Sequence, residues 1–292
     1  MKDSTSTMNK IKLALSLLVV LLCLQMDAAA RDTNLFVFLC FGQSNMEGFP
    51  GLEEQDKKAV DERFQMLAAV DFPRLERKKG NWYPAIPPLC RPNFGIGPAD
   101  YFGRTLVSNL PPHIRVGVVN VSIGGCKIEL FDKENYKSYA ATAPNWMTNI
   151  IAAYGGNPYA HLVQMAKRAQ EDGVIKGILL HQGESNTNDK EWPVKVKGVY
   201  ENLLRDLNLK AEDVPLIAGE VVHAEQKGVC SSMNKIIGEL PKTIPTAQVV
   251  SSQGCAALGD NLHFSPAGYR ELGRRYAEKM LPLLGCKLAE SK

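Results

Sequence analysis

A serine follows shortly after an apolar run near the start of the chain, within Phe41–Gly48 (FGQSNMEG). The run before it, Leu35–Phe41 (LFVFLCF), is continuously hydrophobic, which is typical of a strand buried on both faces. Gly42 allows a sharp turn at the end of such a strand, so that Ser44 is presented above the sheet edge as a candidate nucleophile. The alternative is that this segment is an ordinary polar loop after a strand. The Gly-x-Ser-x-Gly elbow of the α/β-hydrolases occurs nowhere in the chain.

A histidine that can serve as a base lies far along the chain, in Asp260-Asn261-Leu262-His263. A carboxylate three residues before a histidine can reach the imidazole within one turn. There it fixes the tautomer of the ring and stabilises the imidazolium that forms when a serine loses its proton. The alternative is that Asp260 is a turn residue and His263 an ordinary surface residue.

Two further polar segments follow apolar runs in the middle of the chain. Gly124 and Gly125 come after Val116–Val121, where exposed backbone N–H groups can point at a developing oxyanion. Gln182 and Glu184 come after a second run that ends at His181 (HQGES). Each segment alone is a weak signal, because paired glycines and polar strand ends are common in turns.

Strand and helix patterns alternate along the chain. The expected strands are short, rich in branched residues and nearly continuous in hydrophobicity: Leu35–Phe41, Val116–Val121, Gly177–His181, Leu216–Val222 and Ala247–Ser251. The expected helices show apolar spacings of three and four: Ala99–Asn109, Tyr159–Glu171, Glu191–Leu207, Ser231–Leu240 and Pro266–Leu284. Such alternation predicts an α/β fold with a parallel, doubly wound sheet in a single domain, residues 31–292.

Two long stretches rich in Pro, Gly, Asn and aromatic residues are expected to be irregular, Phe49–Pro98 and Phe131–Pro158. Both leave the predicted carboxyl end of a strand, where ligands bind in sheets of this kind. Their neighbourhood holds four aromatic residues that either stack on a ligand or pack the loops down: Trp82, Tyr83, Trp146 and Tyr159.

The four polar segments fall in one order at one predicted sheet edge, and this order resembles that of the SGNH hydrolases. Gly-Gln-Ser-Asn-Met-Glu-Gly, Gly-Gly, His-Gln-Gly-Glu-Ser and Asp-Asn-Leu-His are similar to the family 6 carbohydrate esterases and the sialate O-acetylesterase domains. The resemblance covers roughly Leu35 to Leu284. It implies a three-layer α/β/α fold with a five-stranded parallel sheet in flavodoxin-like order.

The resemblance also implies roles for individual residues. Ser44 is then the nucleophile and His263 the base, and the backbone N–H groups of Ser44 and Gly125 donate to the oxyanion. The third of these segments, His-Gln-Gly-Glu-Ser, departs from the wider SGNH pattern. In that pattern an asparagine of a Gly-x-Asn-Asp run supplies another donor to the oxyanion. Gln182 is the candidate for that donor here. Glu184 becomes a second candidate partner of His263 beside Asp260, which we favour because it lies in the same short segment.

The activity implied is that of a serine esterase on O-acetyl groups of a carbohydrate, with acetylated xylan or a related plant polysaccharide as the favoured substrate. Acetylated polysaccharide or oligosaccharide is accordingly the expected partner. Sialate O-acetyl esters and feruloyl esters are alternatives, because the motifs encode the reaction and the loops encode the substrate. A non-catalytic glycan-binding module is an alternative of another class. Serine–histidine activation requires neither a metal nor an organic cofactor, and none is expected.

The first 30 residues have the order of a secretory signal peptide. Lys10 and Lys12 precede the apolar run Leu13–Leu24, and Ala28–Ala30 offer a cleavage site before Arg31. The run is too short for a typical membrane span of about 20 residues, so no stable membrane insertion is expected after cleavage. The mature protein is expected to be secreted or periplasmic.

Cysteine content and charge limit the alternatives further. Cys23 suggests a lipoprotein, but Leu22 before it is larger than lipid-attachment sites favour. Six other cysteines remain, an even number compatible with disulfides whose pairing the sequence leaves open: Cys40, Cys90, Cys126, Cys230, Cys255 and Cys286. The formal net charge of +3 is too small to indicate nucleic-acid binding, and no nucleic-acid partner is expected.

Overall fold

The computed structural model describes residues 31–49 and 51–286. Within that part of the chain, one seven-stranded sheet has the order β3-β2-β4-β1-β5-β6-β7. The strands are β1 (Leu35–Gly42), β2 (Phe64–Leu67), β3 (Trp82–Pro84), β4 (Arg115–Ser122), β5 (Val174–His181), β6 (Leu216–Gly219) and β7 (Gln248–Val250). All neighbouring pairs are parallel except β2 and β3.

The sheet confirms the predicted α/β class and corrects the predicted strand count. The five expected strands are β1, β4, β5, β6 and β7, and they lie side by side in flavodoxin-like order. β2 and β3 are additional and lie in the stretch Phe49–Pro98 that was expected to be irregular. They have four and three residues, so their own sequence patterns are weak. Pairing of β2 with β4 and of β3 with β2 supplies the order that the local sequence lacks.

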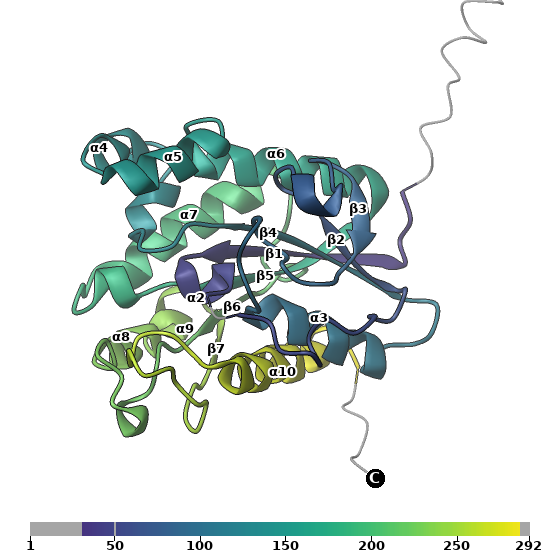
Figure 1. Cartoon of the computed structure of the whole chain (residues 1–292). Helices are drawn as coiled ribbons and strands as arrows, with labels where there is room; N and C mark the ends of the chain where they lie inside the picture. The colour runs from purple at the N-terminus through teal and green to yellow at the C-terminus, as the bar shows by residue number, and fades with distance from the viewer. Residues whose placement is uncertain (1–30, 50, 287–292) are drawn as a thin grey trace, which may run out of the picture. The chain divides into compact units, whose positions relative to one another are not determined.

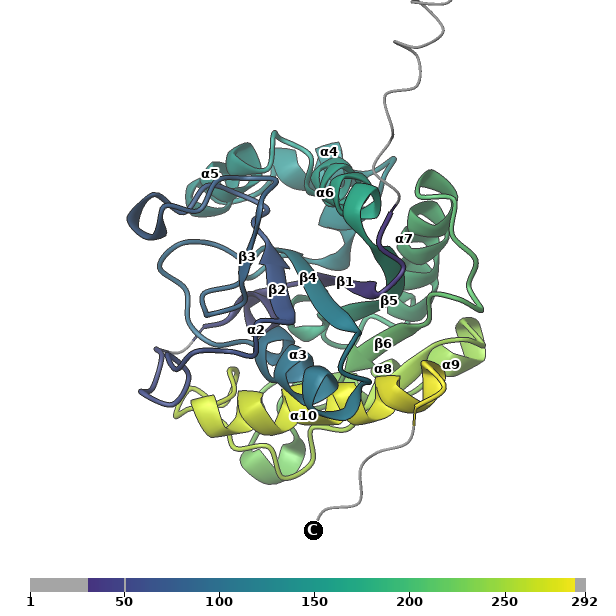
Figure 2. The ribbon, with the colours of Figure 1, turned by 90° about the vertical axis from the view of Figure 1, so that its right-hand side faces the viewer.

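Two long helices cover each face of the sheet (Figures 1 and 2). α3 (Pro98–Asn109) and α10 (Pro266–Leu283) lie on one face, and α6 (Pro158–Asp172) and α7 (Trp192–Asp206) lie on the other. Ser265 caps α10 by accepting a hydrogen bond from the Gly268 N–H at 3.2 Å, with Pro266 in the first turn. The three-layer architecture follows from burying the β strands between these helices.

Shorter helices complete the structure. They are α2 (Ser44–Glu47), α4 (Tyr136–Ala141), α5 (Asn145–Ala153), α8 (Met233–Ile237) and α9 (Leu240–Thr243), with 3₁₀ turns η1 (Pro73–Leu75), η2 (Ile128–Phe131), η3 (Glu184–Asn186) and η4 (Ala224–Gln226). Much of the second stretch expected to be irregular, Phe131–Pro158, is therefore helical, and the single helix expected over Ser231–Leu240 is divided between α8 and α9.

The central strand β1 lies within the hydrophobic core. Phe38 packs edge-on against Phe102 of α3 at a ring-centroid distance of 4.9 Å, and Phe41 packs similarly against Phe131 at 5.2 Å. These two contacts lie on opposite faces of the strand, because neighbouring side chains alternate in direction. Burial of each such side chain contributes about 1.5–3 kcal/mol. The strand that carries the nucleophile segment is therefore held from both sides.

The remaining predictions concern the N-terminal region and the cysteines. The predicted signal peptide, residues 1–30, lies outside the described residues. No helix within residues 31–49 and 51–286 is long and apolar enough to cross a membrane. The six cysteines from Cys40 to Cys286 are free thiols in the structure.

Candidate active site

The central strands end level with one another at the edge that carries the site. Gly42 at the end of β1 pairs with Ser122 of β4 and with His181 of β5. Gly42 has a φ of 150°, and a Cβ placed on it would lie 2.0 Å from the His181 carbonyl oxygen. Only glycine fits this close approach. Ser44 then begins α2 directly above the strand end.

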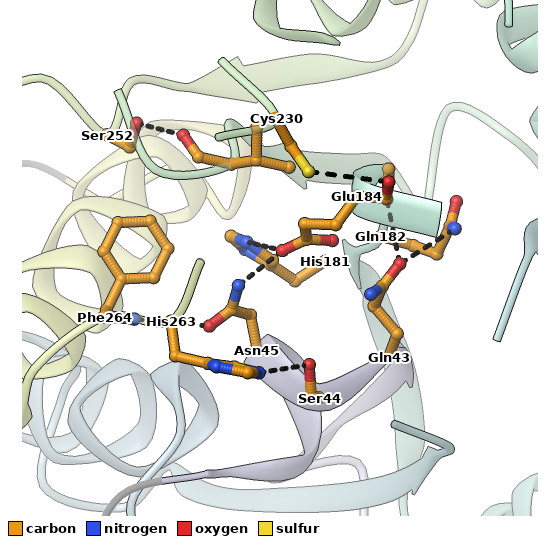
Figure 3. A network of polar contacts seen from close by, with 12 residues as sticks. Gln43, Ser44, Asn45, His181, Gln182, Glu184, Cys230, Ser252, His263 and Phe264 are labelled. Atoms are coloured by element: carbon orange, nitrogen blue, oxygen red, sulfur yellow. Dashed lines mark hydrogen bonds and ion pairs between the residues drawn. The ribbon is translucent and has the colours of Figure 1, made fainter. Parts of the chain in front are cut away.

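A serine, a histidine and an aspartate form a continuous hydrogen-bonded array at this edge. The Ser44 Oγ lies 2.9 Å from the His263 Nε2, a contact drawn in Figure 3. The His263 Nδ1 lies 2.7 Å from the Asp260 Oδ2. Ser44 and His263 are 9% and 8% exposed, so the reacting pair is largely shielded from water while a face stays open to the cavity.

Asp260 is held by the backbone of its own turn. Its Oδ1 accepts hydrogen bonds from the N–H groups of Leu262 at 2.9 Å and His263 at 3.0 Å. Partial burial alone raises the pKa of Asp260, but hydrogen bonds from the His263 ring and from these two N–H groups outweigh it, so the pKa is lowered. Asp260 is therefore a carboxylate that faces the imidazole.

Asn45 joins the nucleophile segment to the histidine segment, a role that the sequence reasoning missed. Its Nδ2 donates to the Leu262 carbonyl oxygen at 3.1 Å and to Glu184. Its Oδ1 accepts from the Phe264 N–H at 3.4 Å and from the Tyr269 hydroxyl. The residue next to the nucleophile thus contacts the backbone on both sides of His263. Its position beside Ser44 in the Gly-Gln-Ser-Asn-Met run was the available signal.

Glu184 lies behind the array, with no hydrogen bond to His263. It is buried, and its Oε1 accepts from Asn45 and lies 3.9 Å from the His181 Nε2. Burial raises the pKa of Glu184, which the hydrogen bond from Asn45 only partly opposes, and burial lowers the pKa of His181 to about 3. Of the two carboxylates considered from the sequence, the structure brings Asp260 against the imidazole and Glu184 against Asn45.

Two backbone N–H groups are available for an oxyanion. Within the described part of the chain, the N–H groups of Ser44 and Gly125 donate to no acceptor, and both residues line the cavity in front of the serine. The N–H of Gly124 is occupied, because it donates to the Glu47 Oε2 at 3.0 Å. Gly125 has a φ of 70°, in the left-handed region that favours glycine, and the Trp146 ring lies against it.

Gln182 does not line the cavity. Its Nε2 donates to the Asn186 Oδ1 at 2.8 Å, to the Gln43 Oε1 at 3.1 Å and to the Cys126 carbonyl oxygen at 3.2 Å. Its Oε1 accepts from the Trp192 Nε1 at 2.5 Å. The amide is fully engaged inside the protein, and this arrangement disagrees with the predicted contact between Gln182 and the oxyanion.

The cavity in front of Ser44 has a volume of about 540 Å³ and largely apolar walls. Phe49 stacks on the His263 ring at a centroid distance of 3.9 Å and an interplanar angle of 15°. Trp146 stands at the rim with 53% of its surface exposed. Arg91 also lines the cavity, where it stacks over Phe94 and forms an ion pair with Glu47.

The other three aromatic residues considered from the sequence pack against the protein. The Trp82 Nε1 donates to Asp172 at 2.8 Å, the Tyr83 hydroxyl accepts from the Lys78 N–H at 2.7 Å, and the Tyr159 hydroxyl donates to Asp206 at 2.7 Å. Of the four, only Trp146 lines the cavity. Across residues 31–49 and 51–286, no group of three or more His, Cys, Asp or Glu side chains is placed to hold a metal ion.

The doubly wound sheet and the Ser–His–Asp array after its first and last core strands define a serine hydrolase of the SGNH type. The family model described as "Carbohydrate esterase, sialic acid-specific acetylesterase" matches residues 34–282, so the chain belongs to this family. It is accordingly a carboxylic ester hydrolase that acts on carbohydrate.

Three solved structures share the fold. A protein from Arabidopsis thaliana is 20% identical with a TM-score of 0.65, and the match covers 86% of this chain and 98% of that one. NanS is 18% identical with a TM-score of 0.61, and the match covers 87% and 98% of the two chains. A carbohydrate acetylesterase from Xanthomonas citri is 17% identical with a TM-score of 0.58, over 83% of this chain and 55% of that one. At these identities the similarity establishes the fold.

Proposed function

We propose that this protein removes O-acetyl groups from a glycan by a two-step serine mechanism. The Ser44 Oγ attacks the ester carbonyl carbon while the His263 Nε2 takes the hydroxyl proton. The tetrahedral intermediate then expels the sugar oxygen, which receives that proton from His263. Water, deprotonated by His263, hydrolyses the acetyl-Ser44 ester and releases acetate. The observation that carries the proposal is the continuous contact from Ser44 through His263 to Asp260 at a cavity.

Asp260 selects the tautomer that this mechanism needs. An ionised carboxylate only accepts hydrogen bonds, so the Nδ1 that faces it carries the proton. The Nε2 then has a free lone pair towards the Ser44 hydroxyl. The negative charge also stabilises the imidazolium formed after proton transfer.

The free N–H groups of Ser44 and Gly125 are placed to stabilise the oxyanion. Each carries no other hydrogen bond within the described residues, so neither must be released from an acceptor before the reaction. Loss of one such preorganised donor costs about 2.7–4 kcal/mol of transition-state stabilisation in a well-studied protease. Donors of this kind therefore contribute a large share of the rate enhancement.

The charges around the cavity favour a neutral sugar, such as an acetylated xylan unit. The acidic and basic side chains among its described lining residues are Glu47, Arg91, Glu184 and His263, and His263 is neutral in the proposed mechanism. Arg91 is already neutralised by Glu47, so this set has no surplus cation for an anionic sugar. The exposed aromatic faces of Phe49 and Trp146 suit the apolar face of a pyranose ring.

A sialate O-acetylester is the second candidate, and the description of the family model is the observation that favours it. Sialate carries a carboxylate, and Arg91 is the cavity residue able to receive it. That contact requires Arg91 to share its charge between Glu47 and the substrate.

Acetate release from acetylated xylo-oligosaccharides and from O-acetylated sialosides tests the substrate. We expect the higher kcat/KM on the neutral substrate. A higher value on the sialoside, lost in Arg91→Gln, would overturn the preference for a neutral sugar and leave the esterase chemistry intact. Absence of Ser44-dependent hydrolysis of these substrates and of p-nitrophenyl acetate would refute the esterase itself and favour a glycan-binding role.

A further inference from the structure

Two consecutive glycines after β4, Gly124 and Gly125, form the segment that carries the second free backbone N–H at the cavity. Glycine has more backbone freedom than any other residue, so a pair of glycines does not hold an N–H in one direction by itself. A preorganised oxyanion donor nevertheless requires a fixed direction. Contacts from neighbouring side chains therefore have to hold this segment in front of Ser44.

Side chains hold the backbone on both sides of the Gly125 N–H. The N–H of Gly124 donates to the Glu47 Oε2 at 3.0 Å, and the carbonyl oxygen of Gly125 accepts from the Ser185 Oγ at 2.9 Å. The peptide group that carries the free N–H lies between these two anchored groups. Glu47 is the more buried of the two anchors, because it is 3% exposed while Ser185 is only partly buried.

Glu47 belongs to the same short helix as the nucleophile. It is the last residue of α2, three residues after Ser44. A Cβ placed on Gly124 would lie 3.0 Å from the Glu47 Oε2 and 3.5 Å from the Ser44 Cβ, so the glycine segment packs directly against α2. Glu47 therefore connects the helix that carries the nucleophile to the segment that carries the Gly125 N–H.

Arg91 supplies the positive charge that the buried Glu47 carboxylate needs. Its Nε donates to the Glu47 Oε1 at 2.6 Å, and its Nη2 donates to the same oxygen. Burial raises the pKa of Glu47, and the charge and hydrogen bonds of Arg91 oppose that shift. The two carboxylate oxygens thus have separate partners, because Oε1 faces Arg91 and Oε2 faces the Gly124 N–H.

We propose that Glu47 is the residue that positions the Gly125 N–H for the oxyanion, and that Arg91 holds the Glu47 carboxylate in the orientation this requires. Glu47 acts through the backbone of Gly124 and not on the ester itself. This inference rests on the proposed serine esterase function.

The first test is Glu47→Gln, which keeps the size of the side chain and replaces one oxygen by an NH₂ group. Arg91 only donates, so the amide oxygen faces Arg91 and the NH₂ group faces the Gly124 N–H, which also only donates. Displacement of the glycine segment should weaken the Gly125 contact with the oxyanion. We expect kcat on p-nitrophenyl acetate to fall by at least about tenfold, and at most by the roughly 10²–10³-fold that loss of one oxyanion donor costs, with little change in KM.

A second substitution should restore part of the rate. In the double variant Glu47→Gln with Arg91→Met, no guanidinium competes for the amide oxygen, so this oxygen can accept from the Gly124 N–H again. Its kcat should be about tenfold above that of Glu47→Gln alone, whereas a merely structural role of the ion pair predicts no recovery. Glu220→Gln is the matched control, because the Glu220 Oε2 accepts from the Ser252 N–H at 2.9 Å and does not line the cavity.

A second measurement reports the oxyanion site without turnover. Methylboronic acid forms a tetrahedral adduct with an active serine, so its inhibition constant should rise in Glu47→Gln in parallel with the fall in kcat/KM. The inhibition constant should fall again in the double variant. If Glu47→Gln is too unstable to purify, Glu47→Asp replaces it. The shorter carboxylate keeps its charge beside Arg91 but no longer reaches both partners, so a loss in kcat is expected again.

The outcomes are distinguishable from failure of the proposed function. If wild type is active and Ser44→Ala inactive, but Glu47→Gln keeps kcat close to that of wild type, the inference is overturned. It is also overturned if the double variant is as slow as Glu47→Gln or slower, because the ion pair then only supports the fold. A wild type without Ser44-dependent hydrolysis would instead remove the function on which the inference rests.

Discussion

Replacing Asp260 by Asn is expected to slow the enzyme more than removing the side chain beyond Cβ altogether. The Asp260 Oδ1 accepts from the backbone N–H groups of Leu262 and His263, which can only donate. In Asp260→Asn these two N–H groups therefore keep the amide oxygen facing them. The NH₂ group of the asparagine then faces the His263 Nδ1. The Nδ1 must then accept, so the proton moves to Nε2 and the lone pair towards Ser44 is lost.

The sizes of the two losses in rate depend on which His263 tautomer remains and on whether water can reach the His263 Nδ1. Loss of the reactive tautomer in a protease triad lowers kcat by about 10⁴-fold, which is ~5.5 kcal/mol. In Asp260→Ala the imidazole keeps access to its reactive tautomer. Because the Asp260 side chain is 42% exposed, water can reach the Nδ1. What is lost is one charged hydrogen bond of about 1.5–3 kcal/mol, or roughly 10- to 10²-fold in rate.

The assay is kcat/KM on p-nitrophenyl acetate for both variants, with thermal melts to check folding. The ¹⁵N chemical shifts of His263 report the tautomer independently of activity. Glu184→Gln is the comparison, and it should retain most activity because its oxygen can still accept from Asn45. The reasoning is refuted if Asp260→Asn is as active as Asp260→Ala, or if Glu184→Gln is the variant that collapses.

Three further predictions concern the nucleophile, stability and processing. Ser44→Ala should lower turnover about 10⁴-fold or more with an unchanged circular dichroism spectrum, and retention of several per cent of activity would exclude Ser44 as nucleophile. Burial raises the pKa of Asp100 to about 7, so the folded state keeps a proton that the unfolded state loses near its ordinary 3.8. Wild type should therefore lose stability relative to Asp100→Asn as the pH rises from about 4 to 7, by up to a few kcal/mol, and parallel denaturant titrations of the two proteins should show this divergence. N-terminal sequencing of protein from the native host should find a mature chain that begins near Arg31; an unprocessed start would contradict export.

The sequence predicted those parts of the fold that depend on local patterns of sufficient length. Strands of the core and the long helices carry continuous or periodic hydrophobicity, and α10 also carries its cap at Ser265. β2 and β3 were missed because four and three residues hold no period, and their order comes from pairing with β4 and with each other. Long-range pairing of this kind has no local signature.

The site shows the same division between local and long-range information. Asp260 and His263 lie within one turn, so their contact was accessible from spacing. The placement of the Gln182 amide depends on its partners Gln43 and Cys126, which come from segments far apart in the chain. The sequence identified Gln182 as a polar residue after β5, but it did not show that the amide is engaged inside the protein.

The nucleophile and its base are 219 residues apart, and Asn45 ties their two segments together directly. The reactive pair therefore assembles only after the first and last strands of the sheet have joined the same structure. Contacts between such distant segments form late and slow the folding of a domain. During refolding, esterase activity should consequently recover after the helical signal. Because the Ser44–His263 contact joins both ends of the described chain, catalytic activity indicates that folding is complete. A partly folded chain is expected to be inactive.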